Sequence, residues 1–208
     1  MHREIDLETW ERRSTFEFFK DFEDPYFNIT ANLNVARLYD MCKSNDLAFS
    51  LAFLFYSLET ANEIREFRRR MIGESVVEFD RVEATQTILN EDKTFSFSYY
   101  RWKDNVVEFV SEGRVSRDKY LSLKTFDVET DRLDLIYYSA FPWVSFTSFK
   151  HASRLNNRQT IPRMVFGKMF EENGSRKMPF SVEAHHAMMD GYHVGLYYET
   201  LQQKLNSL

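Results

Sequence analysis

Apolar and polar residues follow two periods along the chain, one typical of helices and one typical of strands. Apolar positions near a 3.6-residue repeat predict helices, and strict alternation predicts half-buried strands. Helices are expected within 7–22 and at 35–43, 46–64, 104–123 and 191–205. Strands are expected at 26–35, 93–102, 133–146, 163–170 and 177–186. A hairpin that turns at Gly73 is expected over 66–80. Segment 46–64 is apolar on nearly every side, which predicts a central helix.

The mixture of helices and strands indicates the fold class. We expect an α/β (α+β) two-layer sandwich, in which helices pack on a mixed β-sheet. With 208 residues the chain suits one domain, 1–208, around a single core. Its 6 Gly and 4 Pro form no stretch that reads as a linker, and no internal repeat is visible.

Charge and composition exclude several classes of protein. A net charge of −5 argues against a nucleic-acid partner, and the run 68–70 of three arginines lies between Glu66 and Glu74, as on a solvated strand face. The longest apolar run, 47–58, is too short to cross a membrane. The single Cys42 cannot form an intrachain disulfide and fits a cytoplasmic location. Aromatic residues reach 16%, enough to line an apolar pocket or a subunit interface.

The stretch "HHAMMDG", 185–191, carries the candidate chemistry. An imidazole suits general-base catalysis because its pKa lies near working pH. Neighbouring residues at a strand end point to opposite faces, so only one of His185 and His186 can face a site. A metal site would need further ligands, and the histidines at 2, 151 and 193 show no ligand spacing. Spacing alone leaves a catalytic and a structural histidine open.

Four segments in order resemble the signatures of the chloramphenicol acetyltransferase family. These are "TWERRSTFEFF" (9–19), "TFSFS" (94–98), "SAFPWVSFTSF" (139–149) and "HHAMMDGYHVG" (185–195). The element HHxxxDG is also shared with lipoyl-type acyltransferase cores and condensation enzymes. Combined with the PWVSFTSF segment it is specific, and the similarity spans essentially the whole chain.

The resemblance implies an O-acetyltransferase that uses acetyl-CoA and no metal. By position His186 is the general base, which removes the proton of a chloramphenicol hydroxyl as that oxygen attacks the thioester in a ternary complex. Ser139 is the donor to the oxyanion. Asp190 and Arg12 correspond to a structural salt bridge that supports the base, whose other ring nitrogen is held by its own backbone carbonyl. The family is a homotrimer with active sites at subunit interfaces.

The resemblance also assigns binding residues. Residues that match the acceptor pocket are Phe18, Phe19, Phe95, Ser96, Phe126 and Val165, and residues that match the coenzyme site are Trp143, Phe149 and Lys168. Without the resemblance the phenylalanines and the tryptophan read as core residues.

Three positions depart from the family pattern. Val165 replaces a threonine that orders a water, Met169 replaces a tyrosine near the adenine, and Phe19 replaces a tyrosine that contacts the antibiotic. We therefore expect weaker catalysis, because a polar partner of the transition state is lost. Two alternatives stay open: a different small alcohol or amine acceptor, and a non-catalytic trimeric binding module. A lipoamide-dependent core is disfavoured because the chain has no lipoyl or tether segment.

Overall fold

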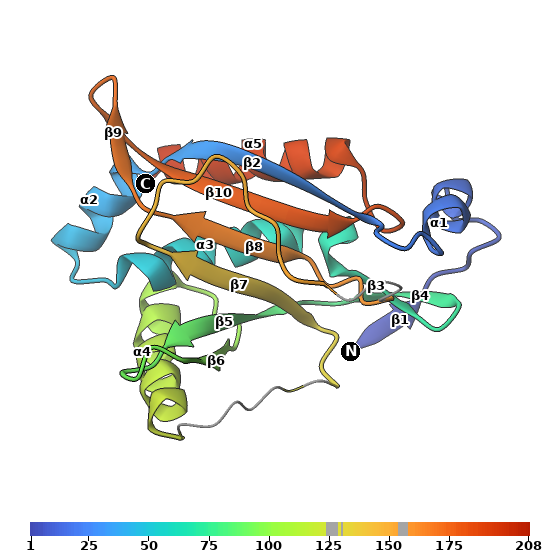
Figure 1. Ribbon diagram of the computed structural model, residues 1–208, viewed down its shortest axis with the longest axis horizontal. Coiled ribbons are helices and arrows are strands. Elements are labelled where there is room, and N and C mark those ends of the chain that lie inside the picture. Colours follow the sequence, from blue (N-terminus) through green and yellow to red (C-terminus); the bar gives the residue numbers. More distant parts are fainter. Residues whose placement is uncertain (124–128, 130, 154–157) are drawn as a thin grey trace.

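The computed structural model describes residues 1–123, 129, 131–153 and 158–208. Its main element is a mixed sheet with strand order β2-β10-β8-β7-β5-β6, and β9 pairs with β10 (Figure 1). Strand β7 runs parallel to β5 and to β8, whereas the other pairs are antiparallel. The strands are β2 (Tyr26–Asn34), β5 (Glu83–Leu89), β6 (Phe95–Tyr100), β7 (Leu135–Phe141), β8 (Arg163–Gly167), β9 (Phe170–Glu172) and β10 (Ser175–His185).

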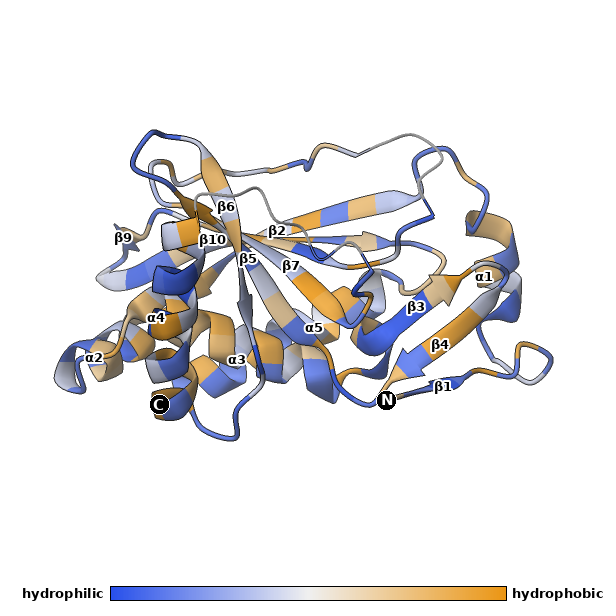
Figure 2. Ribbon diagram, turned by 90° about the horizontal axis from the view of Figure 1, so that it is seen from below, coloured by the Kyte–Doolittle hydropathy of each residue, from blue (hydrophilic) through white to orange (hydrophobic). Residues whose placement is uncertain are grey.

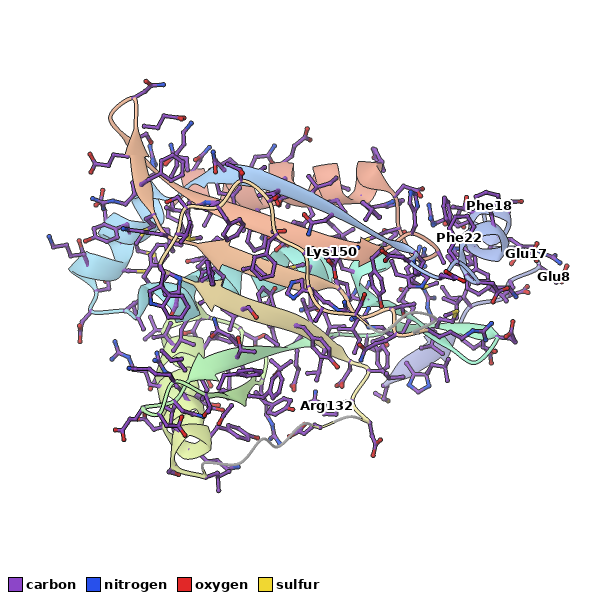
Figure 3. The ribbon with its side chains drawn as sticks, in the orientation of Figure 1. Glu8, Glu17, Phe18, Phe22, Arg132 and Lys150 are labelled. Atoms are coloured by element: carbon purple, nitrogen blue, oxygen red, sulfur yellow. The ribbon has the colours of Figure 1, made fainter. Side chains whose placement is uncertain are left out.

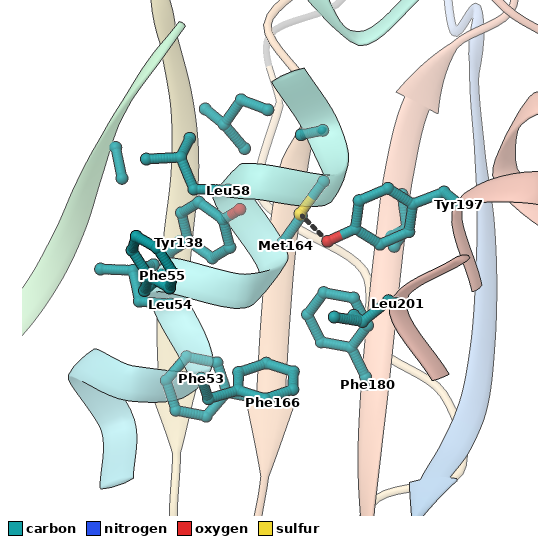
Figure 4. Packing of buried hydrophobic residues seen from close by; sticks show 14 of the residues in the cluster. Phe53, Leu54, Phe55, Leu58, Tyr138, Met164, Phe166, Phe180, Tyr197 and Leu201 are labelled. Atoms are coloured by element: carbon teal, nitrogen blue, oxygen red, sulfur yellow. Dashed lines mark hydrogen bonds between the residues drawn. The ribbon is translucent and has the colours of Figure 1, made fainter. Parts of the chain in front are cut away.

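Helices cover one face of this sheet, as the view from below shows (Figure 2). They are α2 (Ala36–Ser44), α3 (Phe49–Glu63), α4 (Val106–Leu123) and α5 (Gly191–Asn206). In the core beneath α3, the ring of Phe53 packs edge-on against the rings of Phe166 and Phe180 (Figure 4). The Tyr197 hydroxyl lies 3.6 Å from the sulfur of Met164, so a buried polar group keeps a partner. The predicted two-layer fold is confirmed.

A second, smaller sheet has the order β1-β4-β3 and lies beside α1. It contains β1 (His2–Glu4), β3 (Arg69–Ile72) and β4 (Ser75–Phe79). The 3₁₀ turn η1 (Arg65–Arg68) directly precedes β3, and the neighbouring helix α1 spans Arg13–Phe19. Gly73 turns the predicted hairpin with φ of +61°, a conformation that glycine adopts without steric cost.

The prediction of a solvated face for the arginine run is wrong, because Arg69 and Arg70 are buried. Arg69 donates to Glu66 at 2.9 Å and to Glu78 at 3.2 Å. Arg70 donates to backbone carbonyls, among them that of Leu135 at 2.6 Å. Hydrogen bonds to carboxylates and carbonyls therefore compensate the desolvation of both guanidinium groups.

Other boundaries differ from the pattern-based predictions. Strands β1 and β5 were not predicted, the helix expected within 7–22 forms only at Arg13–Phe19, and the strand expected at 133–146 ends at Phe141. Cys42 is buried, which raises the pKa of its thiol to about 11. In the described part of the chain, no helix is long and apolar enough to cross a membrane.

Candidate active site

His186 follows directly on β10 and contacts two aromatic rings. Its imidazole stacks on Phe19 at 4.1 Å with an angle of 9° between the ring planes, and it tilts against Phe27 at 4.8 Å. The side chain is 33% exposed, while the ring atom Nδ1 is buried. Nε2, unlike Nδ1, is not among the buried side-chain atoms that lack a partner in the described residues, so Nε2 is the ring nitrogen that we expect a substrate to reach.

Arg12 and Asp190 form a clamp under this histidine. Arg12 Nη1 contacts Asp190 Oδ2, and Nη2 donates to Asp190 Oδ1 at 3.1 Å. The same Nη2 lies 3.3 Å from the backbone carbonyl of His186. The Arg12 side chain is 8% exposed, so its charge needs this partner. The hydrogen bond from Arg12 keeps the pKa of the Asp190 carboxyl below its ordinary value.

The clamp also determines the surroundings of His186 Nδ1. This atom lies 3.2 Å from Asp190 Oδ1, without the angles of a hydrogen bond, and within the described ranges it has no hydrogen-bond partner. The carbonyl expected to hold Nδ1, that of His186 itself, is instead contacted by Arg12. Stacking on Phe19 and the tilted contact with Phe27, together with Asp190 at the Nδ1 edge, hold the ring in this structure.

Ser139 lies in β7, on the sheet face opposite to the one that α3 covers. Its hydroxyl is 3.0 Å from that of Thr87 on β5. On its other side Ser139 is in register with Val165, and Val165 with Ser181. The helix-covered face is marked by the preceding residue, Tyr138, whose hydroxyl lies 2.9 Å from Ser57 Oγ of α3. Because side chains alternate along a strand, Ser139 and Thr87 face away from the helices.

Ser139 and His186 do not meet within one chain. His186 lies five positions beyond Ser181, which is about 16 Å along a strand. Ser181 itself is two strands away from Ser139, a further separation of about 10 Å. In Figure 1 the arrowheads of β7 and β10 point to opposite ends of the sheet, in agreement with this register. We call the surroundings of His186 and the surroundings of Ser139 the two half-sites.

The residues matched to the coenzyme site gather at the Ser139 end. The rings of Trp143 and Phe149 lie 5.4 Å and 6.2 Å from the ring of Phe141, the last residue of β7. The Lys168 backbone N–H donates to the carbonyl of Val144 at 3.1 Å, which places Lys168 beside this segment. Trp143 and Lys168 are exposed, so both are available to a ligand.

Gly167 allows that segment to lie on the sheet. A Cβ at this position would come within 2.8 Å of Phe146 and 2.7 Å of Pro179. The absence of a side chain therefore lets the Phe146 ring pack against the end of β8.

The residues matched to the acceptor pocket are divided between the half-sites. Phe19 contacts His186, and Phe18, 64% exposed, lies beside Phe22 at the α1 end of the molecule (Figure 3). Phe95 is exposed at the sheet edge, on the face of Ser139, with its ring 5.8 Å from that of Phe97. Ser96 is buried on the opposite face and bonds Asn90, so it does not join Phe95. Phe126 lies outside the described residues.

Three residues near the half-sites received no role from the sequence. Thr87 lies in β5, which was not predicted, although its β-branched residues Thr85, Thr87 and Ile88 are typical of a strand. Phe27 belongs to the predicted strand β2, but nothing in the pattern shows that it packs on His186. His193 was only part of the signature, yet its Nδ1 accepts a hydrogen bond from the Asp190 backbone N–H at 3.0 Å. In the described ranges, no group of three or more His, Cys, Asp or Glu could hold a metal.

Comparison with known proteins decides the family. The family model described as chloramphenicol acetyltransferase matches residues 1–202. The chain belongs to the chloramphenicol acetyltransferase family. It is 28% identical over 200 residues to the chloramphenicol acetyltransferase of Proteus mirabilis, covering 96% of this chain and 92% of that one. Identity to the Staphylococcus aureus enzyme is 29% over 202 residues, with 96% and 93% covered.

Solved structures agree with this assignment. A chloramphenicol acetyltransferase superposes with a TM-score of 0.88 at 28% identity, covering 99% of this chain and all (100%) of the other. The cubic core of a pyruvate dehydrogenase multienzyme complex gives a TM-score of 0.67 at 13% identity, with 87% and 81% covered. At that identity the second likeness shows a shared fold alone.

The structure shows the surroundings of the three residues that depart from the family pattern. Val165 is fully buried next to Ser139, so it offers methyl groups on one flank of that hydroxyl, and Thr87 is the polar neighbour on the other flank. Met169 packs against the main core. Phe19 presents a hydrocarbon face to His186.

Proposed function

We propose that this protein is an O-acetyltransferase that moves an acetyl group from acetyl-CoA to a hydroxyl of chloramphenicol. The observation that carries the proposal is the His186 half-site, where the ion pair of buried Arg12 with Asp190 and two aromatic rings hold an imidazole whose Nε2 is open. Membership of the chloramphenicol acetyltransferase family supports the choice of donor and acceptor. We place the enzyme in the cytoplasm, where acetyl-CoA is available.

The proposed reaction needs two groups of this chain. His186 Nε2 accepts the proton of the acceptor hydroxyl while that oxygen bonds to the thioester carbonyl carbon. The carbonyl oxygen becomes an oxyanion, which the Ser139 hydroxyl stabilises by donating a hydrogen bond. The carbon–sulfur bond then breaks, and the departing thiolate takes the proton from the imidazolium. Acetyl ester and coenzyme thiol are the products, so the enzyme returns to its starting protonation state.

The separation of Ser139 from His186 supports a site shared between subunits. We propose a homotrimer in which His186 of one chain faces Ser139 of a neighbour, as closed symmetric oligomers permit. Apolar side chains exposed near the half-sites, Phe18 and Phe22 at one end and Phe95 and Trp143 at the other, are suited to burial in such an interface.

Thiol release measures the proposed activity directly. Purified protein with acetyl-CoA should release coenzyme thiol at a rate that depends on chloramphenicol, and His186→Ala should abolish that dependence. His2→Ala serves as the matched control, because His2 lies in β1 of the small sheet. Absence of chloramphenicol-dependent release at millimolar substrate would contradict the proposed acceptor.

Subunit complementation tests the shared site. His186→Ala is expected to be inactive and Ser139→Ala to lose on the order of 100- to 1,000-fold in kcat, because each variant lacks one half of every site. When the two variants are co-expressed in equal amounts, random mixing should restore about one quarter of the sites. Recovery requires that the two groups come from different chains. If mixed oligomers of confirmed composition regain nothing, the groups act within one chain and the shared-site proposal fails.

A second acceptor class is favoured by Phe19. The stacked phenyl ring lacks a hydroxyl, so the surface next to His186 selects for apolar contact and offers no hydrogen bond there. A panel of small alcohols and amines, measured by the same thiol assay, will rank acceptors. Phe19→Tyr restores the hydroxyl and is expected to raise kcat/KM for chloramphenicol relative to less polar alcohols.

A further inference from the structure

We infer that His193 is a positioning residue for His186, and that it acts as a neutral hydrogen-bond acceptor at the first turn of α5. This inference rests on the proposed function, in which His186 is the base. His193 does not touch the reacting groups. It holds the backbone of Asp190, and Asp190 in turn borders His186.

The contact occurs at the end of α5 where backbone N–H groups have no intrahelical partner. Asp190 is the N-cap residue, and its N–H donates to Nδ1 of His193, the third residue of the helix, at 3.0 Å. A side chain at this position that reaches back to the N-cap N–H is one half of a capping box, a role that Glu or Gln usually fills. Here an imidazole fills it.

The accepting role determines the protonation state of His193. Nδ1 can accept only when it carries no proton, so the neutral ring must bear its hydrogen on Nε2. Nε2 lies 3.9 Å from Oε1 of Glu66 in η1. Protonation of Nδ1 would remove the acceptor, leave the Asp190 N–H without its partner and release the start of α5.

Charged groups from every neighbouring element act on this ring. Arg12 precedes α1 and Arg69 lies in β3, and both disfavour a second positive charge, whereas Glu66 and Asp190 favour it. Burial is the largest effect, and the net result is a lowered pKa for His193. The direction agrees with the geometry, because the neutral form is the one that completes the cap.

The consequence for catalysis follows from the order of contacts. Asp190 Oδ1 lies next to His186 Nδ1 and also accepts from Arg12, which contacts the His186 carbonyl. A shift of the first turn of α5 therefore moves the carboxylate away from both. Misplacement of a catalytic group by about 1 Å costs on the order of 100-fold in rate.

Two substitutions separate this role from a general effect on folding. His193→Gln keeps an acceptor that can reach the N-cap N–H but cannot titrate. His193→Leu keeps the bulk and removes the acceptor. We expect His193→Gln to retain kcat within about threefold, and His193→Leu to lose about 10- to 100-fold in kcat with little change in the KM for acetyl-CoA.

The pH profile gives a readout that simple destabilisation would not produce. In the unmodified enzyme, log(kcat/KM) should steepen toward a limiting slope of two at low pH, because both the general base and His193 must be neutral. In His193→Gln the slope should stay at one. Glu66→Gln removes a charge that favours protonation of His193, so the steepening of the profile should move to lower pH. In the His193→Gln background, Glu66→Gln should have no such effect.

A spectroscopic measurement keeps the test independent of acetyl transfer. The pH titration of the His186 ring resonances, assigned with His186→Ala, should change in His193→Leu and be preserved in His193→Gln, even if another acceptor proves to be the substrate. Circular dichroism and thermal unfolding establish that both variants are folded. Unchanged kcat, slope and His186 titration in folded His193→Leu would overturn the inference, as would equal losses in the Gln and Leu variants.

Discussion

Replacement of Asp190 by Asn removes one charge from the clamp beneath His186 with almost no change in shape. Arg12 is 8% exposed and Asp190 36% exposed at the side chain, so the cation is buried while its partner is in part solvated. In Asp190→Asn the guanidinium keeps one neutral acceptor and faces an amide N–H₂ group. Breaking a fully buried pair costs about 3–5 kcal/mol, and solvent around Asp190 reduces this to roughly 2–3 kcal/mol.

The free energy of unfolding from urea denaturation is the appropriate measure, together with kcat. A loss of roughly 2–3 kcal/mol corresponds to a fall in the melting temperature of about 5–10 °C for a chain of this size. Protein concentration must be the same for every variant, because the proposed oligomer would be stabilised by mass action. The matched control is Glu17→Gln, which breaks the solvated i,i+4 pair between Arg13 and Glu17. That change should cost at most about 0.5 kcal/mol.

The pH dependence has a defined sign. Asp190 has a lowered pKa in the folded state, so the pair stabilises the fold above the ordinary pKa of an aspartate. This contribution is lost as the pH falls through the folded-state pKa, and Asp190→Asn should lack it. The reasoning is refuted if the Asn variant is as stable and as active as Glu17→Gln, since the buried Arg12 charge would then not depend on the carboxylate.

Three further predictions concern other parts of the molecule. Thr87→Val removes the hydroxyl that orients Ser139 and should lower kcat several-fold, which corresponds to about 1 kcal/mol. In a Ser139→Ala background the same change should have no effect. A double-mutant cycle of kcat checks this, and additive effects of the two substitutions would contradict it. Burial lowers the pKa of His185 to about 4, so the unfolded state binds a proton more readily than the folded state. The free energy of unfolding should therefore decrease as the pH falls from about 6.5 to 4, by roughly 3 kcal/mol at most. Urea denaturation at several pH values should show a smaller decrease for His185→Gln. Gly167→Ala should displace Phe146 and raise the KM for acetyl-CoA, whereas an unchanged KM would show that the ring moves without affecting the coenzyme.

The sequence predicts those elements whose apolar residues follow one period without interruption. Helix α3 is apolar around most of its circumference, and strand β6 alternates through Phe95 and Phe97, so both were found. Strand β5 was missed because Thr85 and Gln86 are polar but buried, which hides the alternation of its apolar positions. Burial of Arg69 could not be read from the sequence either, because its partner Glu78 comes from another strand.

The candidate site was predicted by resemblance and not by pattern. Arg12 and Asp190 are 178 positions apart in the chain, and no local rule brings them together. The family signature supplies that pair, whereas the stack of Phe19 on His186 and the cap made by His193 depend on tertiary packing that only coordinates reveal. Local propensities describe neighbours along the chain, and a site built from distant segments requires the packed fold.

The two half-sites are held by different means, and this difference determines which substitutions affect catalysis. His186 depends on the ion pair between Arg12 and Asp190 and on a helix cap, whereas Ser139 is fixed by the register of β7 between β5 and β8. If the half-sites meet across an interface, their mutual placement depends on subunit packing as well. Substitution of the exposed Phe18 should then lower kcat without destabilising the single chain, because its ring contacts only Phe19 and Phe22 among the aromatic side chains of the described residues.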